Sequence, residues 1–213
     1  RNANLGEKVE IGKRVAVIGG GNTAMDAART ALRLGAKEVT IVYRRSEAEI
    51  TAAREEIDEA LEEGIKFQML TSPKTITEGS GKVAGLECRL NELGEADSGG
   101  RRRPVPVEGS EFVIPVDNVI LAVGQKPDLS GLDTGIDVSK KSTVVASGET
   151  GVTSIAGVFA AGDVVTGPAT VIDAIGAGKK AAFSIDRFLR GEEVSTVENN
   201  AGVKVADFPL HKS

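Results

Sequence analysis

The sequence predicts an α/β protein in which helices pack on a mainly parallel sheet. Its 213 residues are 40% hydrophobic but include no Trp and only 3% aromatic side chains, so the core has to be built mostly from Val, Ile, Ala and Leu. The 26 Gly residues suit tight turns between strands and helices. The order strand, glycine turn, helix occurs twice, which indicates layered strands and helices.

Charge and composition exclude several classes of partner. The chain has 26 basic and 31 acidic residues and a net charge of −5, which offers no general attraction to nucleic acid or to an anionic membrane. No stretch approaches the ~20 apolar residues of a membrane span, and no apolar signal segment is present at the N-terminus, so we expect a cytoplasmic protein. Cys88 is the single cysteine and lacks companions for a metal site, so we expect it to be a small apolar strand residue.

The first strand, turn and helix form a dinucleotide-binding pattern. The Val-rich run from Arg14 to Ile18 predicts a buried strand, and a helical pattern follows from Asn22 to Gly35. The turn between them reads Gly19-x-Gly21-x-x-Ala24. Gly19 permits the tight turn, Gly21 lets the backbone approach a pyrophosphate, and Ala24 lets the helix pack close to the strand. The alternative is a glycine-rich turn with no ligand.

The second strand ends in a feature that selects the nucleotide. The strand from Glu38 to Tyr43 ends about 20 residues after the glycine turn, where an NAD-binding fold places an acidic residue for the ribose hydroxyls. Arg44 and Arg45 stand there instead, and paired guanidinium groups suit the additional 2′-phosphate of NADP. The sequence therefore favours NADP(H) over NAD, and the alternative is a solvated or ion-paired strand end.

The middle of the chain predicts a further helix and an antiparallel meander. A capping box at Ser46 and Glu49 predicts the start of a second helix that ends at Gly64. After a third strand, turn residues separate four short strand patterns, which lie at Lys74 to Thr77, Lys82 to Leu90, Val105 to Val107 and Phe112 to Pro115. The segment from Asp97 to Pro106 predicts an exposed hairpin loop. Its arginines, Arg101 to Arg103, are interpreted as solvated, with contact to a phosphate or a partner protein as the alternative.

The last third of the chain adds a second group of candidate residues. An apolar strand from Asn118 to Val123 stops at Gly124, so Ala122, Val123 and Gly124 are candidate cofactor contacts or a plain turn. A second strand pattern ends at Gly162 and Asp163 and precedes a helix from about Thr170 to Leu189. An aspartate there can accept hydrogen bonds from ligand hydroxyls, and a helix N-terminus can stabilise negative charge, which suits a reduced flavin.

These motifs carry a resemblance to a known family. The residues concerned are Val17 to Asp26, Ala31 to Gly35, Tyr43 to Ser46, Val119 to Pro127 and Val158 to Ala174. Together they resemble the glutamate synthase small (beta) subunit family, which is itself similar to the flavin half of dihydropyrimidine dehydrogenase and to NADPH:ferredoxin oxidoreductase-type subunits. The likeness extends over nearly residues 12 to 190.

The resemblance implies specific roles. Gly21, Asn22, Thr23 and Ala24, with Arg44 and Arg45, would contact NADPH. Gly162 and Asp163 would hold the ribityl and phosphate region of FAD, and Thr170 and Val171 would lie against the flavin ring. The implied reaction passes a hydride from NADPH to FAD and electrons onward to iron–sulfur centres, with an iron–sulfur or amidotransferase-type partner. No side chain is required as a catalytic base, because the cofactors supply the chemistry.

The chain departs from the family in two places. Ile50, Thr51 and Ala52 stand where the family usually has Met-Pro-Ala. The family also binds the adenosine half of FAD with a glycine-rich βαβ unit that would precede residue 12, and neither that unit nor the family's cysteine clusters occur in this sequence. We therefore expect the C-terminal part of a longer flavoprotein. His211 is isolated in a polar segment and is assigned no role.

The sequence therefore predicts a Rossmann-like, three-layer FAD/NAD(P)-binding fold with an antiparallel meander. Residues 1–123 are expected to form the NADP(H)-binding domain, and residues 124–213 the C-terminal portion of a FAD domain and a tail. An NADP(H)-binding module without catalysis is the main alternative. A short-chain dehydrogenase is disfavoured, because Tyr43, the only tyrosine, lies on a strand and has no lysine partner on a helix.

Overall fold

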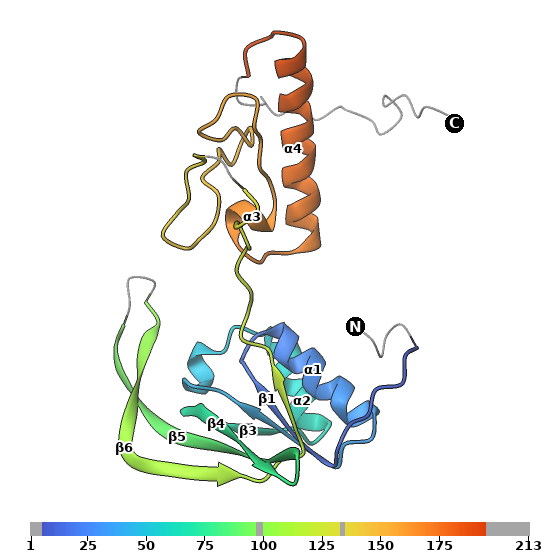
Figure 1. The fold of residues 1–213 in the computed structure, drawn as a ribbon, viewed down its shortest axis with the longest axis vertical. Helices are drawn as coiled ribbons and strands as arrows, with labels where there is room; N and C mark the ends of the chain where they lie inside the picture. Colours follow the sequence, from blue (N-terminus) through green and yellow to red (C-terminus); the bar gives the residue numbers. More distant parts are fainter. Residues whose placement is uncertain (1–5, 97–99, 133–134, 195–213) are drawn as a thin grey trace. The chain divides into compact units, whose positions relative to one another are not determined.

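The computed structural model describes residues 6–96, 100–132 and 135–194, and these form two compact units that divide after Gly124 (Figure 1). The first unit contains a parallel sheet, an antiparallel sheet and the helices α1 and α2. The second unit contains the helices α3 and α4. His211 lies outside the described residues.

A four-stranded parallel sheet forms the centre of the first unit. Its strand order is β3 (Lys66–Gln68), β2 (Glu38–Val42), β1 (Arg14–Ile18), β7 (Asn118–Leu121). Strand β1 is covered on both faces, because Val15 and Val17 pack on one side while Ala16 and Ile18 pack on the other. That double burial explains the nearly continuous apolar sequence of the strand.

Helices cover one face of this sheet. Helix α1 (Asn22–Arg33) buries Ala24, Met25, Ala28 and Ala31 against the Val15 and Val17 side of β1, as its spacing predicts. Helix α2 (Arg54–Glu62) adds Ile57 and Ala60 to the same cluster. The small alanines let α1 lie close to the strands, which is the packing that the dinucleotide fold requires.

The predicted start of the second helix is wrong. The capping box of Ser46 and Glu49 closes the short 3-10 turn η2 (Glu47–Glu49), the chain is extended at Ile50, and α2 begins only at Arg54. The physical reason is a long-range contact: the N–H groups of Thr51 and Ala52 donate to the carbonyl of Gly20 at 2.9 and 3.1 Å and so do not enter a helix. The apolar spacing of Ile50, Ala53, Ile57 and Leu61 also predicts a different buried face, since Ala60 is buried and Leu61 is 49% exposed.

An antiparallel sheet covers the other face. Strands β4 (Thr71–Gly79), β5 (Lys82–Ala96) and β6 (Arg102–Ile114) form a meander, and Leu86 and Cys88 of β5 pack against Ala16 and Ile18 of β1. The first unit is therefore the predicted three-layer α/β fold. Cys88 is fully buried, and burial raises the pKa of its thiol to about 11, so it stays protonated and apolar as expected.

The meander strands are longer than predicted. The two short strand patterns after residue 104 belong to one strand, β6, which continues through Val105 and Phe112. Much of the predicted hairpin loop from Asp97 to Pro106 is also strand, because β6 starts at Arg102. The charged and proline residues of this segment favour a loop in the sequence. In the structure the Arg102 guanidinium donates to the carbonyls of Leu93 and Gly94 on the neighbouring strand, which holds the segment in the sheet. Asp97 itself lies outside the described residues.

The second unit is organised around a long helix. Helix α4 (Val171–Leu189) begins near Thr170 as predicted, and the short helix α3 (Asp163–Thr166) precedes it. The predicted strand before Gly162 is reduced to an isolated bridge between Phe159 and Val152. The ring of Phe159 packs edge-on against Phe188 of α4, with ring centroids 5.8 Å apart, and the N–H of Ala160 donates to the carbonyl of Gly151 at 2.8 Å, so both contacts hold this segment. Among the described residues, no helix has the length and hydropathy needed to cross a membrane.

Candidate functional site

The glycine turn, the arginine pair and the end of β7 lie at one edge of the parallel sheet. The N–H of Gly19 donates to the carbonyl of Val42 at 3.1 Å, which joins the ends of β1 and β2. The N–H of Ala122 donates to the carbonyl of Ile18 at 2.8 Å, which joins the ends of β7 and β1. The carboxyl ends of three neighbouring strands therefore meet where ligands bind in open α/β folds.

Two glycines of the turn are required by the protein itself. Gly19 has a φ of +149°, and a Cβ there would collide with the backbone carbonyl of Ala122. A Cβ on Gly20 would lie 2.5 to 2.9 Å from three atoms of the Tyr43 ring. The contact between Gly20 and Tyr43 was not predicted, because it joins residues on different strands and leaves no local pattern.

Gly21 differs from both neighbours. Its backbone is extended, with φ −104° and ψ 176°, and a Cβ there would meet only the hydroxyl of Thr51 at an ordinary 3.5 Å. No contact within the described chain explains why this residue lacks a side chain. In dinucleotide folds this position is a glycine so that the backbone can approach a pyrophosphate.

Gly21 is also the N-cap residue of α1. In this fully described helix, no side chain caps the N-terminus and no acidic residue stands in the first turn. The amide groups and the positive end of the helix dipole thus face the glycine turn without a protein carboxylate. Such a helix start is suited to a phosphate group.

The other predicted residues of this helix have distinct surroundings. Thr23 is exposed, and Ala24 is fully buried against the sheet. The side-chain oxygen of Asn22 accepts from the N–H of Ala53 at 2.8 Å, which ties the start of α1 to the start of α2. The Asn22 side chain therefore supports the glycine turn from the protein side.

Thr51 also holds the glycine turn in place, through hydrogen bonds that the sequence did not predict. Its N–H and its hydroxyl both donate to the carbonyl of Gly20, at 2.9 and 3.3 Å. A proline, which the resembling family usually has here, has no N–H to make the first of these bonds. The departure at Ile50-Thr51-Ala52 thus strengthens the link between the glycine turn and the entry to α2.

The two arginines after β2 are not equivalent. Arg44 is exposed, whereas Arg45 is only 8% exposed and its Nε donates to the carbonyl of Arg102 at 2.7 Å. Asn91 of β5, itself 4% exposed, donates from Nδ2 to the carbonyl of Arg44 at 3.0 Å. Strands β5 and β6 of the antiparallel sheet therefore hold Arg44 and Arg45 in place through these hydrogen bonds, and the Arg44 side chain is exposed.

The remaining candidates of the first unit are at the end of β7. Ala122 is half-buried and forms the wall against which Gly19 packs. Val123 is 68% exposed, and Gly124 is exposed with a φ of +86°. Ala122 thus has a structural role in the glycine turn, and Val123 offers an apolar surface beside it.

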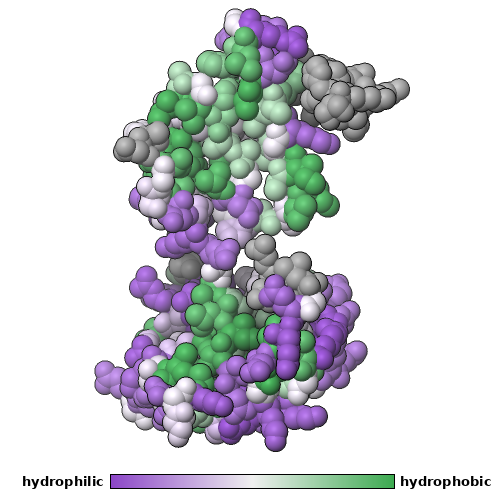
Figure 2. All heavy atoms as spheres, turned by 45° about the vertical axis from the view of Figure 1, so that its right-hand side comes forward, coloured by the Kyte–Doolittle hydropathy of each residue, from purple (hydrophilic) through white to green (hydrophobic). Residues whose placement is uncertain are grey.

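The predicted flavin residues all lie in the second unit. Gly162, with a φ of +73°, precedes α3, and the carboxylate of Asp163 accepts from the N–H of Ala169 at 3.3 Å. The hydroxyl of Thr170 caps α4 by accepting from the N–H of Asp173 at 3.2 Å. Val171 is 76% exposed at the start of α4. Figure 2 shows apolar surface on this unit.

A glycine turn that leads into a helix at the carboxyl edge of a parallel sheet defines a dinucleotide-binding fold. The chain belongs to the pyridine nucleotide-disulphide oxidoreductase family, whose model matches residues 1–178. No group of three or more metal-binding side chains occurs in the part of the chain that the structure describes.

Individual relatives confirm the resemblance inferred from the motifs. The chain is 49% identical over 189 residues to the NADP(+)-dependent formate dehydrogenase subunit beta of Moorella thermoacetica, which covers 88% of this chain and 27% of the relative. It is 42% identical over 184 residues to the glutamate synthase (NADPH) small chain of Escherichia coli K12, and this match covers 84% of this chain and 39% of the relative. The chain thus spans between about a quarter and two fifths of the length of these relatives.

The fold is also similar to solved structures. T. acidophilum thioredoxin reductase superimposes with a TM-score of 0.69 at 28% identity, covering 89% of this chain and 55% of that one. This similarity agrees with the FAD/NAD(P)-binding fold class predicted from the sequence.

Proposed function

We propose that the chain is the NADPH-binding portion of a flavin-dependent oxidoreductase. The observation that carries the proposal is Gly21, whose missing side chain no protein contact explains, at the uncapped start of α1. Gly21 and the amide groups of Asn22 and Thr23 would bind the pyrophosphate. The names of the relatives described above, which include NADP(+) and NADPH, support the choice of nucleotide.

Arg44 is the residue assigned to the 2′-phosphate of the nucleotide. It follows β2 directly, it is exposed, and a guanidinium forms strong, charge-assisted hydrogen bonds with phosphate. Arg45 is assigned a supporting role, because it is buried and bonds the backbone of Arg102. Ala122, Val123 and Gly124 would border the nucleotide where β7 ends.

The second unit is assigned to the flavin. Gly162 and Asp163 would lie at the ribityl and phosphate region, and Thr170 and Val171 at the ring. The exposed apolar side chains at the start of α4, Val171 at 76% and Ile172 at 81%, support this assignment because a flat apolar ring would cover them. Because Thr170 already caps α4, its contribution would come through the helix start and not through a free hydroxyl.

When bound, NADPH and FAD would supply hydride-transfer chemistry, and the role of this chain's residues would be to bind and align the two cofactors. Electrons would then pass to iron–sulfur centres on a partner subunit or domain, as in an enzyme similar to the glutamate synthase small subunit. The partner assignment is supported by the relatives, which are named as a beta subunit and a small chain. No side chain of this chain is assigned as an acid or a base.

The nucleotide assignment is tested by replacing the arginines one at a time. Arg44→Ala should weaken NADPH binding about tenfold or more, leave NADH binding unchanged, and leave the free energy of unfolding unchanged. Arg45→Ala should also weaken NADPH binding but should lower the free energy of unfolding by about 1–3 kcal/mol, since it removes a buried hydrogen bond. Calorimetric titration and urea denaturation measure these effects. Equal losses for NADPH and NADH would contradict the assignment.

A further inference from the structure

The tip of the β5–β6 hairpin meets the end of β2. Arg45 donates to the carbonyl of Arg102 at 2.7 Å, and the guanidinium of Arg101 donates from one nitrogen to the hydroxyl of Tyr43 at 3.2 Å and to the carbonyl of Glu49 at 3.3 Å. Arg101 is half-buried. The interpretation of this arginine as a solvated loop residue is therefore wrong, because the hairpin folds onto the parallel sheet.

The residues that Arg101 touches border the proposed nucleotide site. The Tyr43 ring packs on Gly20, the middle residue of the glycine turn, and its hydroxyl donates to the carbonyl of Glu49 at 2.6 Å. Arg44 lies between these two contact points in the chain. The Arg101 guanidinium is thus placed along the segment from Tyr43 to Glu49 that presents Arg44.

The acidic side chains of this segment are bonded elsewhere. The Glu49 carboxylate accepts from the N–H of Ser46, and Glu47 pairs with Arg54 at 2.9 Å. The partner of the Glu49 carboxylate, Ser46, stands just before the η2 turn, and the partner of the Glu47 carboxylate, Arg54, stands at the start of α2. Arg101 therefore adds a guanidinium from a distant part of the sequence beside the segment that carries Arg44, and guanidinium groups form strong hydrogen bonds with a phosphate.

We propose that Arg101 is a specificity-determining residue that selects nucleotides with a 2′-phosphate. The inference rests on the proposed function, because it assigns a further residue to the same nucleotide site. Arg44 would approach the phosphate from the end of β2, and Arg101 from the hairpin. The antiparallel sheet would then take part in nucleotide selection as well as in covering the parallel sheet.

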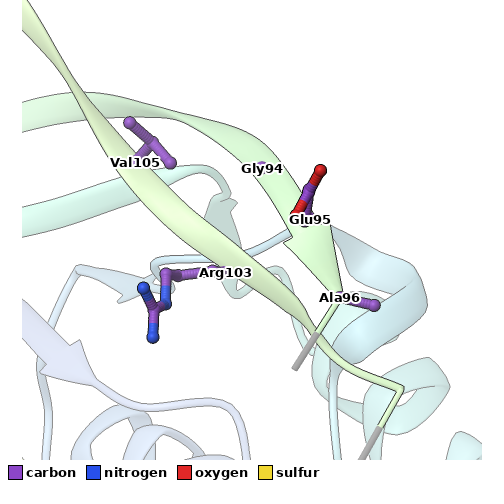
Figure 3. A pocket seen from close by; sticks show the side chains of 5 residues that line it. All are labelled: Gly94, Glu95, Ala96, Arg103 and Val105. Carbon is purple, nitrogen blue, oxygen red and sulfur yellow. The ribbon is translucent and has the colours of Figure 1, made fainter. Parts of the chain in front are cut away.

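Arg103 provides a matched control on the same hairpin. It lies two residues from Arg101, carries the same charge and is exposed. It lines a hollow of about 420 Å³ formed with Gly94, Glu95, Ala96 and Val105 of the hairpin itself (Figure 3). Replacing Arg103 removes the same charge from the hairpin without removing the contact to Tyr43.

The test compares Arg101→Ala and Arg103→Ala in titrations with 2′,5′-ADP and 5′-AMP, two probes that differ only in the 2′-phosphate. Arg101→Ala should weaken binding of 2′,5′-ADP about tenfold and leave binding of 5′-AMP unchanged, and Arg103→Ala should change neither. Arg101→Lys, which keeps the charge but loses the planar fork, should give an intermediate loss and serves as a second variant if Arg101→Ala fails to fold.

The outcomes distinguish a failure of the Arg101 assignment from a failure of the proposed function. Unchanged binding of 2′,5′-ADP by Arg101→Ala overturns the role of Arg101 while the wild-type preference for this probe upholds the proposed function. Equal losses in Arg101→Ala and Arg103→Ala overturn it as well, because only the overall charge of the hairpin would then matter. A wild-type chain that binds 5′-AMP as tightly as 2′,5′-ADP would overturn the NADP assignment and this inference together.

Discussion

Gly19, Gly20 and Gly21 are adjacent, but each lacks a side chain for a different reason. Gly19 meets the carbonyl of Ala122, Gly20 meets the ring of Tyr43, and Gly21 meets nothing closer than the Thr51 hydroxyl at 3.5 Å. Packing explains two of the three, and the proposed pyrophosphate contact would explain the third.

Paired substitutions separate these roles. Gly20→Ala should lower the free energy of unfolding by about 1–3 kcal/mol, because the Tyr43 ring has to move to admit a methyl group. Gly21→Ala should leave that free energy nearly unchanged but weaken NADPH binding, since the methyl group would stand where the pyrophosphate approaches. Urea denaturation and calorimetric titration of both variants check this. Equal effects of the two substitutions on stability and on binding would refute the separation.

The sequence predicts only some residues of the candidate site. Gly19, Gly21, Arg44 and Arg45 were found because the dinucleotide pattern places them at fixed distances along one βαβ unit. The hydrogen bonds of Thr51, Asn91 and Arg101 join segments that lie far apart in the sequence. Such contacts depend on how the antiparallel sheet and the entry to α2 fold back, and no local spacing encodes them.

At the scale of elements, Asp117 fastens the start of β1 to the start of β7. Its carboxylate accepts from the N–H groups of Lys13 and Arg14, both at 2.9 Å, and from the guanidinium of Arg14 at 2.8 Å. The Arg14 side chain and these backbone bonds lower the pKa of Asp117 to about 2 from an ordinary value of 3.8. The neighbouring strands β1 and β7 are therefore joined at their amino ends by one ionised side chain.

This linkage has a defined pH dependence. A carboxyl group with a lowered pKa in the folded state stabilises it fully above pH 3.8, and this contribution is lost as the pH falls towards about 2. The difference in free energy of unfolding between the wild type and Asp117→Asn should therefore be constant near neutral pH and shrink below pH 3.8. Denaturation series at several pH values measure it. A difference that does not change with pH would show that ionisation of Asp117 is unimportant.

The errors in the predicted elements share a cause. The capping box at Ser46 and Glu49 forms locally as predicted, yet α2 starts later because Gly20 captures the N–H groups of Thr51 and Ala52. Strand β6 runs through charged residues and prolines because β5 pairs with it over most of its length. Long-range hydrogen bonds override local propensity in both cases. In contrast, β1 has the predicted bounds, and α1 starts at Asn22 as predicted and ends at Arg33, two residues before Gly35.

At the scale of the molecule, the order of elements was the most predictable property. Apolar runs and glycine turns in the sequence predict the order β1, α1, β2, followed by a meander and a returning strand β7. The three-layer fold follows from this order. The chain divides after Gly124, which assigns the nucleotide candidates to the first unit and the flavin candidates to the second.

The central claim is that the first unit binds NADP(H) through the glycine turn and selects it by its 2′-phosphate. Calorimetric titration of the wild-type chain with NADPH and with NADH, after its visible spectrum has been recorded for bound flavin, tests this claim most directly. The account predicts saturable binding of NADPH at least about tenfold tighter than that of NADH, a difference of about 1.4 kcal/mol. Equal affinity for the two nucleotides, or no binding of either, would contradict it.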